Sequence, residues 1–438
     1  MASPDFVARQ LAATLLAGVW TARAMQRRME NLLGRSTRKA QRLLLREIFL
    51  KAEALYPPAP TQLVRIIFDC PAFARATETV QRAKRPMPAV LAPAKFAPAL
   101  YFANLGVPQI STAGALAAWL GLTIEQLDWL ADSKQMHGRT ETPALQHYHY
   151  SFAPKRSGDL RLIEAPKPRL KAIQRKILRE ILDLVPAHDC AHGFVRRRSC
   201  LSAAQLHASE FVVVTLDLTH FFPSVALART GALFRRLGYP PTVARLLVGL
   251  CSTSTPSGVL AQAPGFDWRM RKLYGAPHLP QGAPTSPALA NACAWRLDQR
   301  LRGLASRMEL NYARYADDLA FSGDERFAAS LGGFQRTVET IVASEGFALN
   351  QAKTRIMRAS GRQRVAGVVV NQHVNVARPY YDELKAILHN CSRHGPALQN
   401  RDGSRDFRAH LDGRVGWVES VNPGRGVRLR EVFDTIMW

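Results

Sequence analysis

The sequence predicts an α+β fold in which a few strands are dispersed among many helices. Three observations support this class. Residues 147–166 alternate like a β-hairpin, 210–217 form a strongly apolar run typical of a buried strand, and apolar runs on both sides of 317–318 predict two further short strands. Helical patterns fill the intervals between these strands, and no internal repeat is visible, so the pattern indicates an α+β protein.

The first 105 residues are predicted to be a basic helical extension with a proline-rich linker. Apolar residues recur at helix period up to YPPAP at 56–60, a shorter helical piece follows, and repeated prolines in 84–100 exclude a long helix. The run LAATLLAGVW at 11–20 has one basic residue before it and several after it, which favours an amphipathic helix over a signal peptide. No run reaches the ~18 apolar residues of a membrane span, so we expect a cytoplasmic protein with no membrane partner.

Residues 111–132 predict a compact pair of helices with Ser111 and Thr123 as N-caps. DNA binding by this pair remains open, but simple packing is favoured because the second helix has no basic residue. The hairpin that follows is expected to turn at residues 157–159, and a basic helix is expected directly after it.

The chain is strongly basic, with 59 Lys and Arg against 34 Asp and Glu and a net charge of +25 over 438 residues. Such a charge suits a polyphosphate partner, because neutralised phosphates release condensed counterions. An anionic membrane surface is the rival interpretation. The six cysteines lie far apart with no C-x-x-C pair, which argues against a zinc site or a disulfide scaffold and favours a reducing compartment.

Three aspartates are predicted to meet at one edge of a sheet. Asp217 ends the apolar strand, and Asp317 and Asp318 form the tip of the later hairpin. Buried like charges raise each other's pKa, and a divalent cation removes that penalty. Mg²⁺ takes hard oxygen ligands, and two such ions about 3.5–4 Å apart suit phosphoryl or nucleotidyl transfer. A solvated turn is the alternative for an adjacent Asp pair.

A further stretch, LPQGAPTSP at 279–287, is a Gly/Pro-rich turn that becomes a helix. Together with the Asp217 strand and YADD at 315–318, and in this order, it resembles the A, B and C motifs of a reverse transcriptase palm. This resemblance implies a right-hand polymerase, with fingers and palm at 106–360 and an RNA-binding thumb at 361–438. It also implies an RNA-directed DNA polymerase in which Asp217, Asp317 and Asp318 are catalytic and hold two Mg²⁺ ions.

The same resemblance implies which residues bind the substrate. Phe222 matches the aromatic residue that crowds a ribose 2′-OH and so selects dNTPs; a plain core residue is the alternative. Gln281 and Gly282 would contact the template and the nascent base pair. Arg161, and less clearly Lys155, match basic residues that grip the triphosphate, and Lys353 matches a lysine close to the leaving pyrophosphate.

Four segments resemble the retron type of reverse transcriptase: 191–207, 364–371, 374–391 and 410–423. Two of them depart from the family pattern. The family pattern N-A-x-x-H corresponds to residues 203–207 and ends at His207, but Ala203 replaces its asparagine. The pattern V-T-G corresponds to residues 365–367, but Ala366 replaces its threonine before Gly367. The family ties both segments to its RNA, so His207 and Gly367 are candidate RNA-binding residues. The thumb adds basic candidates, namely Lys385, Arg393, Arg408, Arg414, Arg425 and Arg428.

A retron enzyme is implied to bind a cognate structured noncoding RNA of the msr–msd type. It would start from a 2′-OH of an internal guanosine and copy part of that RNA into RNA-linked single-stranded DNA (msDNA), often beside an effector protein in antiphage defence. A group II intron-type enzyme would need maturase regions, for which we expect no room after residue 318. Another bacterial defence polymerase and a non-catalytic RNA-binding protein also remain open as interpretations.

Overall fold

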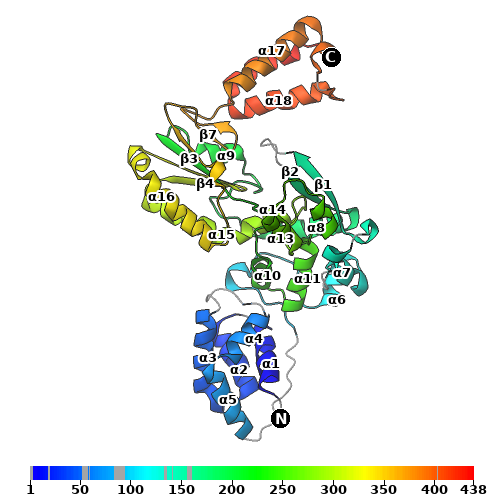
Figure 1. Ribbon diagram of the computed structural model, residues 1–438, viewed down its shortest axis with the longest axis vertical. Coiled ribbons are helices and arrows are strands. Elements are labelled where there is room, and N and C mark those ends of the chain that lie inside the picture. The colour runs from blue at the N-terminus through cyan, green and yellow to red at the C-terminus, as the bar shows by residue number, and fades with distance from the viewer. Residues whose placement is uncertain are drawn as a thin grey trace. The chain divides into compact units, whose positions relative to one another are not determined.

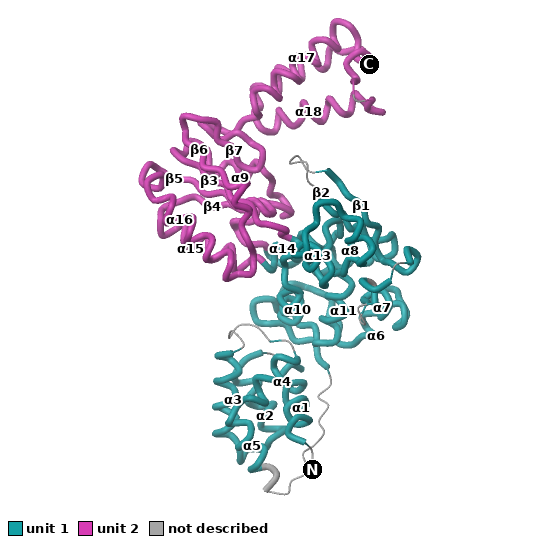
Figure 2. Tube along the Cα trace, viewed as in Figure 1, with its two compact units in different colours: residues 1–186, 222–293 teal, residues 187–221, 294–438 magenta. Residues whose placement is uncertain are grey.

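The computed structural model describes residues 3–17, 20–51, 58, 60–82, 94–132, 136–140, 142–154, 160–401 and 403–438. The chain forms two compact units, one of residues 1–186 and 222–293 and the other of residues 187–221 and 294–438 (Figure 2). Each unit therefore contains two separate stretches of the chain. Within the described ranges, no helix is both long enough and apolar enough to cross a membrane.

The N-terminal helices of the first unit share a hydrophobic core of their own, in which Leu11, Met25, Leu44 and Ile67 are fully buried. Side chains of Ser3 and Thr21 accept hydrogen bonds from the first turns of two of these helices. The helical pattern expected before residue 56 is confirmed up to Lys51, and residues 52–56 lie outside the described ranges (Figure 1). The elements are α1 (Pro4–Leu16), α2 (Ala22–Leu33), η1 (Arg35–Thr37), α3 (Arg38–Lys51), α4 (Pro60–Phe68) and α5 (Pro71–Arg82).

The rest of the first unit contains a two-stranded antiparallel hairpin and several helices. Strand β1 (Tyr148–Pro154) pairs with β2 (Leu160–Pro166), as the alternation predicted; the expected turn at 157–159 lies outside the described residues. The other elements are η2 (Leu100–Phe102), α6 (Ala113–Leu120), α7 (Ile124–Leu130), η3 (His137–Arg139), η4 (Pro143–Leu145), α8 (Pro168–Glu180), η5 (Leu182–Leu184), α10 (Leu227–Arg236), α11 (Pro241–Cys251), α12 (Ser257–Ala261), α13 (Trp268–Gly275) and α14 (Ser286–Cys293).

One predicted helix cap is wrong by a single residue. Thr112, not Ser111, caps α6, and its side chain accepts a hydrogen bond from the backbone N–H of Ala115. Ser111 instead accepts a hydrogen bond from the backbone N–H of Phe96. The expected cap at Thr123 is confirmed as a full capping box.

A four-stranded antiparallel sheet in the order β4-β5-β3-β6 forms the centre of the second unit. The strands are β3 (Val212–Asp217), β4 (Asn311–Tyr315), β5 (Asp318–Gly323) and β6 (Arg355–Arg358). The apolar run before Asp217 and the runs around 317–318 therefore form neighbouring strands, as predicted. The short strands β7 (Arg364–Val365) and β8 (Val368–Val369) form a separate hairpin.

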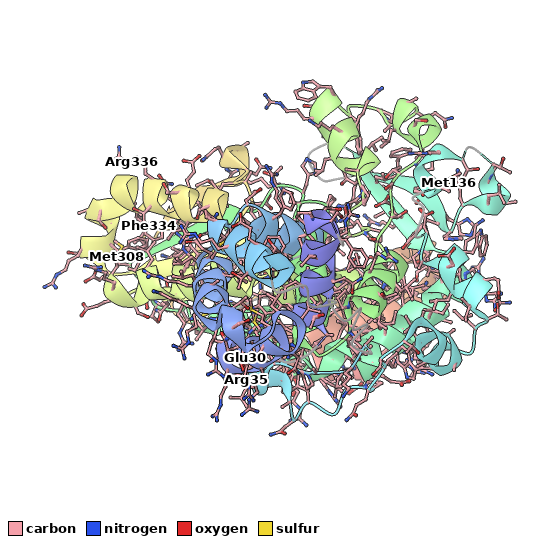
Figure 3. The ribbon with its side chains drawn as sticks, turned by 90° about the horizontal axis from the view of Figure 1, so that it is seen from below. Glu30, Arg35, Met136, Met308, Phe334 and Arg336 are labelled. Atoms are coloured by element: carbon pink, nitrogen blue, oxygen red, sulfur yellow. The ribbon has the colours of Figure 1, made fainter. Side chains whose placement is uncertain are left out.

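Helices cover this sheet and continue toward the C-terminus. Phe334 of α16 (Glu325–Ser344) packs edge-on against Phe321 of β5, with ring centroids 4.9 Å apart, whereas Arg336 points outward (Figure 3). The other helices of this unit are α9 (Cys200–Gln205), α15 (Trp295–Arg307), η6 (Gln351–Lys353), α17 (Arg378–His394), η7 (Ala397–Gln399), α18 (Phe407–Val421) and α19 (Pro423–Asp434). Buried side chains of α17, α18 and α19 join the β7–β8 hairpin in one core.

Candidate active site

The structure brings the three predicted aspartates together at one end of the four-stranded sheet. Asp217 is the last residue of β3 and lies directly opposite Asp318, the first residue of β5. The backbone N–H of Leu218 donates to the carbonyl oxygen of Asp317 at 2.9 Å. Pairing of two adjacent strands therefore places two aspartates that are 101 positions apart in sequence directly opposite one another.

Lys353 joins this group from η6. Its Nζ lies 2.8 Å from Oδ2 of Asp217, and the backbone N–H of Asn350 donates to the carbonyl oxygen of Asp217. The Asp217 side chain is almost buried, whereas the Lys353 side chain is about half exposed. The lysine thus offsets the charge of Asp217 while its side chain remains partly exposed to solvent.

The electrostatics of the group fit a divalent cation. Partial desolvation and the negative charges of Asp317 and Asp217 raise the pKa of Asp318 to about 6, against a lowering effect of Lys353. Carboxylate oxygens are the hard ligands that Mg²⁺ prefers. The side chains themselves are not gathered around a common point, because Asp217 is turned to Lys353, and within the described ranges no three His, Cys, Asp or Glu side chains form a ready-made metal site.

A buried ion pair that the sequence analysis missed supports the turn that carries Asp317. Arg314 and Asp298 are both fully buried, and two guanidinium nitrogens donate to the two carboxylate oxygens at 2.8 and 2.6 Å. A third nitrogen of Arg314 donates to the carbonyl oxygen of Ala316 at 3.0 Å. Ala316 has φ +58°, an unfavourable value for a residue with a Cβ, so the guanidinium holds a strained turn.

A second close contact fixes the same turn from another segment. Gly193 lies so close to the turn that a Cβ there would collide with the backbone nitrogen of Ala316. The backbone N–H of His192 donates to the carbonyl oxygen of Arg314 at 2.7 Å. The segment 190–193 therefore requires a glycine at this position to support the aspartate turn.

The Gln281–Gly282 loop belongs to the first unit and is attached to strand β2. The backbone N–H of Glu164 donates to the carbonyl oxygen of Gln281 at 2.8 Å. Gly282 has φ +134°, and a Cβ there would lie 3.0 Å from the carbonyl oxygen of Glu164, so glycine is needed for both reasons. Gln281 is half-buried and Gly282 is exposed, which leaves this loop open to a ligand.

The other expected substrate residues also lie in the first unit. Arg161 is exposed on β2, the same strand that anchors the Gln281–Gly282 loop. Phe222 is half-buried at the start of the second stretch of this unit. Lys155 lies outside the described residues.

A cavity of about 270 Å³ lies beside Asp318 in the second unit. Ala203 of α9 and Ala366 and Gly367 of the β7–β8 hairpin line it, and Arg364 adds a positive charge. The two positions at which the chain departs from the retron pattern, Ala203 and Ala366, therefore line one cavity. Gly367 is exposed with φ +88°.

The remaining RNA-binding candidates differ in accessibility. Lys385 is exposed on α17. Arg414 is engaged within the C-terminal helices, with a nitrogen 3.0 Å from Glu383 and its guanidinium over the ring of Tyr380. His207 is fully buried, so direct contact of its side chain with RNA, which the sequence suggested, does not fit this conformation.

Instead, His207 connects two elements of the core. Its Nδ1 lies 2.8 Å from Oγ of Ser322 on β5, while Nε2 is buried and has no hydrogen-bond partner among the described residues. Burial lowers the pKa of His207 to about 4, and the nearby His192 contributes to this. The ring is therefore neutral and supports the sheet through its contact with Ser322 of β5.

Comparison with known proteins defines the class of this site. The family model for reverse transcriptase (RNA-dependent DNA polymerase) matches residues 153–378, which is more than half of the chain. The match includes the aspartate group, Lys353 and the Gln281–Gly282 loop. The protein is therefore a reverse transcriptase, an RNA-directed DNA polymerase with the right-hand fold, and RNA is the template that this class copies.

Curated relatives narrow the class. The chain is 40% identical to the retron Mx65 reverse transcriptase of Myxococcus xanthus over 332 residues, 75% of this chain and 72% of that protein. It is 37% identical to the retron Mx162 enzyme of the same organism (73% of this chain, 66% of that protein) and 29% identical to the retron Ec86 enzyme of Escherichia coli (65% and 80%). The chain belongs to the retron reverse transcriptases.

Solved structures resemble the chain more distantly. Telomerase from Candida albicans has a TM-score of 0.38 at 10% identity, covering 65% of this chain and 56% of that one. The foamy viral protease-reverse transcriptase has a TM-score of 0.30 at 14% identity, covering 67% and 34%. These scores are too low to add to the assignment, which rests on the sequence matches.

Proposed function

We propose that this enzyme binds a cognate structured noncoding RNA of the msr–msd type and copies part of it into msDNA that stays linked to the RNA. The primer would be a 2′-OH of an internal guanosine, and dNTPs would be the other substrate. The membership in the retron family supports this proposal. By the same support, an effector protein in antiphage defence is the proposed cellular partner.

The proposed site is the group Asp217, Asp317 and Asp318, which would hold two Mg²⁺ ions. When bound, the ions supply charge neutralisation at the reacting phosphate and a lower pKa of the primer hydroxyl. The observation that carries this proposal is the direct pairing of Asp217 with Asp318 across β3 and β5. That pairing puts hard oxygen ligands of two neighbouring strands at the same end of the sheet, and the contact of Lys353 with Asp217 limits their repulsion.

The chain's own residues take the remaining roles. We assign Lys353 to the leaving pyrophosphate: its half-exposed side chain would exchange the contact with Asp217 for one with the pyrophosphate. We assign Arg161 to the triphosphate, Phe222 to exclusion of the ribose 2′-OH, and Gln281 with Gly282 to the template and nascent base pair. Exposed Gly367 and Lys385 are assigned to RNA, while Arg414 and His207 would act by supporting the elements around them.

The proposed organisation assigns fingers and palm to residues 106–360 and a thumb to 361–438. Residues 1–105 would form a separate extension, which their own closed core supports. The basic character of the thumb and extension suits the phosphates of a structured RNA, whose helices expose 2′-hydroxyls in a shallow groove.

Primer extension on an RNA template tests the catalytic assignment. The Asp317→Asn variant should lose extension to background while retaining RNA, because the carboxylate is removed without a change in size. The matched control is Asp128→Asn, an exposed aspartate on α7, which should leave extension unchanged. Equal activity of Asp317→Asn and the parent would refute the site.

The nucleic acid that copurifies tests the retron product. We expect it to be sensitive to both RNase and DNase and to contain a 2′–5′ junction. RNA without attached DNA, in an enzyme that extends ordinary primers, would refute msDNA synthesis while leaving the polymerase assignment intact.

A further inference from the structure

A buried acid–imidazole pair lies behind the Gln281–Gly282 loop. Glu164 of β2 and His278 are both almost completely buried, and Nε2 of His278 lies 2.8 Å from Oε2 of Glu164. The other carboxylate oxygen of Glu164 accepts a hydrogen bond from Oγ1 of Thr255 at 2.7 Å. The site described above involves only the backbone of Glu164, and burying an ionisable pair carries a desolvation cost.

The hydrogen-bond pattern fixes the number of protons on this pair. Nδ1 of His278 lies 2.8 Å from the carbonyl oxygen of Ala276, so both ring nitrogens face oxygen acceptors. A neutral imidazole has one N–H and cannot donate to both. The pair therefore holds one proton more than a neutral histidine beside a carboxylate, either on the ring or on the carboxyl group.

The surroundings leave this proton as the charge on the pair that changes with pH. The titratable groups that face the pair are the phenols of Tyr148, Tyr150 and Tyr274, whose pKa values are raised by burial, so they stay neutral. Arg161 is the cation that acts on Tyr274. Burial lowers the pKa of His278, but the charge and hydrogen bond of Glu164 and the Ala276 carbonyl outweigh this and raise it overall.

Both members of the pair also hold the loop through their backbones. His278 exchanges two hydrogen bonds with Thr253, at 2.8 and 3.0 Å, just before the loop begins. Glu164 donates its N–H to the carbonyl oxygen of Gln281, and its own carbonyl oxygen lies 3.0 Å from the position that a Cβ of residue 282 would take. The loop thus begins just after His278 and is hydrogen-bonded to the backbone of Glu164.

We propose that the proton-bound Glu164–His278 pair positions the Gln281–Gly282 loop for the incoming nucleotide, and that loss of the shared proton loosens it. The nucleotide contact of this loop rests on the proposed function. Below the pKa of the pair the proton is bound and the loop is held. As the pH rises through that pKa, one ring nitrogen of His278 loses its hydrogen while it still lies 2.8 Å from an oxygen. The lone pairs of these two atoms then repel each other, and this repulsion weakens the contact between β2 and the Gln281–Gly282 loop.

The Glu164→Gln variant separates this role from simple packing. The glutamine nitrogen can donate to the unprotonated Nε2 of His278, its oxygen can accept from Thr255, and Nδ1–H can still donate to Ala276. Every hydrogen bond is therefore kept without the extra proton. In primer extension, the parent's KM for dNTP should rise roughly tenfold between about pH 7 and about pH 10, with a smaller change in kcat. Glu164→Gln should have a KM close to that of the parent at pH 7 and no such rise.

Two further measurements keep the test decisive. His278→Leu should show the high KM at all pH values, whereas His149→Gln, an exposed histidine on β1, should behave as the parent. Hydrogen exchange of the 278–285 segment in the absence of nucleic acid, corrected for intrinsic rates, should lose protection with rising pH in the parent but not in Glu164→Gln. A parallel pH response in the two proteins would overturn the positioning role. If the hydrogen-exchange protection of the parent falls with rising pH while its KM for dNTP stays constant, the assignment of this loop to the nucleotide would be overturned.

Discussion

Replacing the Arg314–Asp298 ion pair by apolar side chains should separate stability from catalysis. Both side chains are fully buried, two hydrogen bonds of 2.8 and 2.6 Å join them, and the hydroxyl of Tyr312 donates to Asp298 at 2.9 Å. Removing one partner leaves the other charge buried and uncompensated. We therefore expect Asp298→Val to lower the free energy of unfolding of the second unit by about 3–5 kcal/mol.

The double variant Asp298→Val/Arg314→Met should recover most of this loss. No charge is then left in the core, and apolar replacements of buried ion pairs are often neutral or stabilising. Tyr312 loses its acceptor, which costs about 1 kcal/mol, so the double variant should lie within about 2 kcal/mol of the parent. Arg314→Met alone should also cost about 3–5 kcal/mol, so the coupling between the two sites should be at least about 4 kcal/mol in a double-mutant cycle measured by urea unfolding.

Activity should not recover with stability. The double variant lacks the guanidinium that donates to the carbonyl oxygen of Ala316 and holds the turn at φ +58°. Misplacement of Asp317 by a fraction of an ångström should lower kcat roughly 10- to 100-fold, because catalytic geometry is steeply distance-dependent. Parent-level kcat in a stable double variant would refute the positioning role of Arg314, and a loss below about 1 kcal/mol in Asp298→Val would contradict the burial of the pair.

Three further changes test the strained backbone and the buried histidine. Ala316→Gly should raise the free energy of unfolding by about 1 kcal/mol, because glycine adopts φ +58° without strain, and thermal unfolding would reveal it. Gly282→Ala should destabilise the first unit by about 1–3 kcal/mol and raise the KM for dNTP, since its Cβ would press on the carbonyl of Glu164 at 3.0 Å. His207, with a pKa of about 4, must stay neutral in the fold, so stability should fall as the pH drops below about 6.5, by about 3 kcal/mol at pH 4. Unfolding of His207→Gln should lack this pH dependence, and an identical dependence in parent and variant would contradict it.

Local sequence patterns were sufficient for the elements that carry the aspartates. The apolar run at 212–217 and the runs around 317–318 are strands because their residues are buried on both faces, a property that appears directly as continuous hydrophobicity. Strand β6 gave no such signal, because most of its residues are exposed and two are arginines. The cap of α6 was misplaced since Ser111 and Thr112 are both good N-caps, and the hydroxyl of Ser111 is used instead by the backbone N–H of Phe96, which is distant in sequence.

Two charged residues within apolar strands carried information that the sequence analysis did not use. Glu164 lies on the same buried face of β2 as Leu162, and Arg314 follows buried Tyr312 and Ala313 on β4. A charge on the buried face of a strand requires a partner, so each position predicts a buried pair. The partners, His278 and Asp298, cannot be derived from local pattern, because they depend on which helix or loop packs on that face. Pattern reasoning therefore locates the residues that support a site, while the fold is needed to show what they hold.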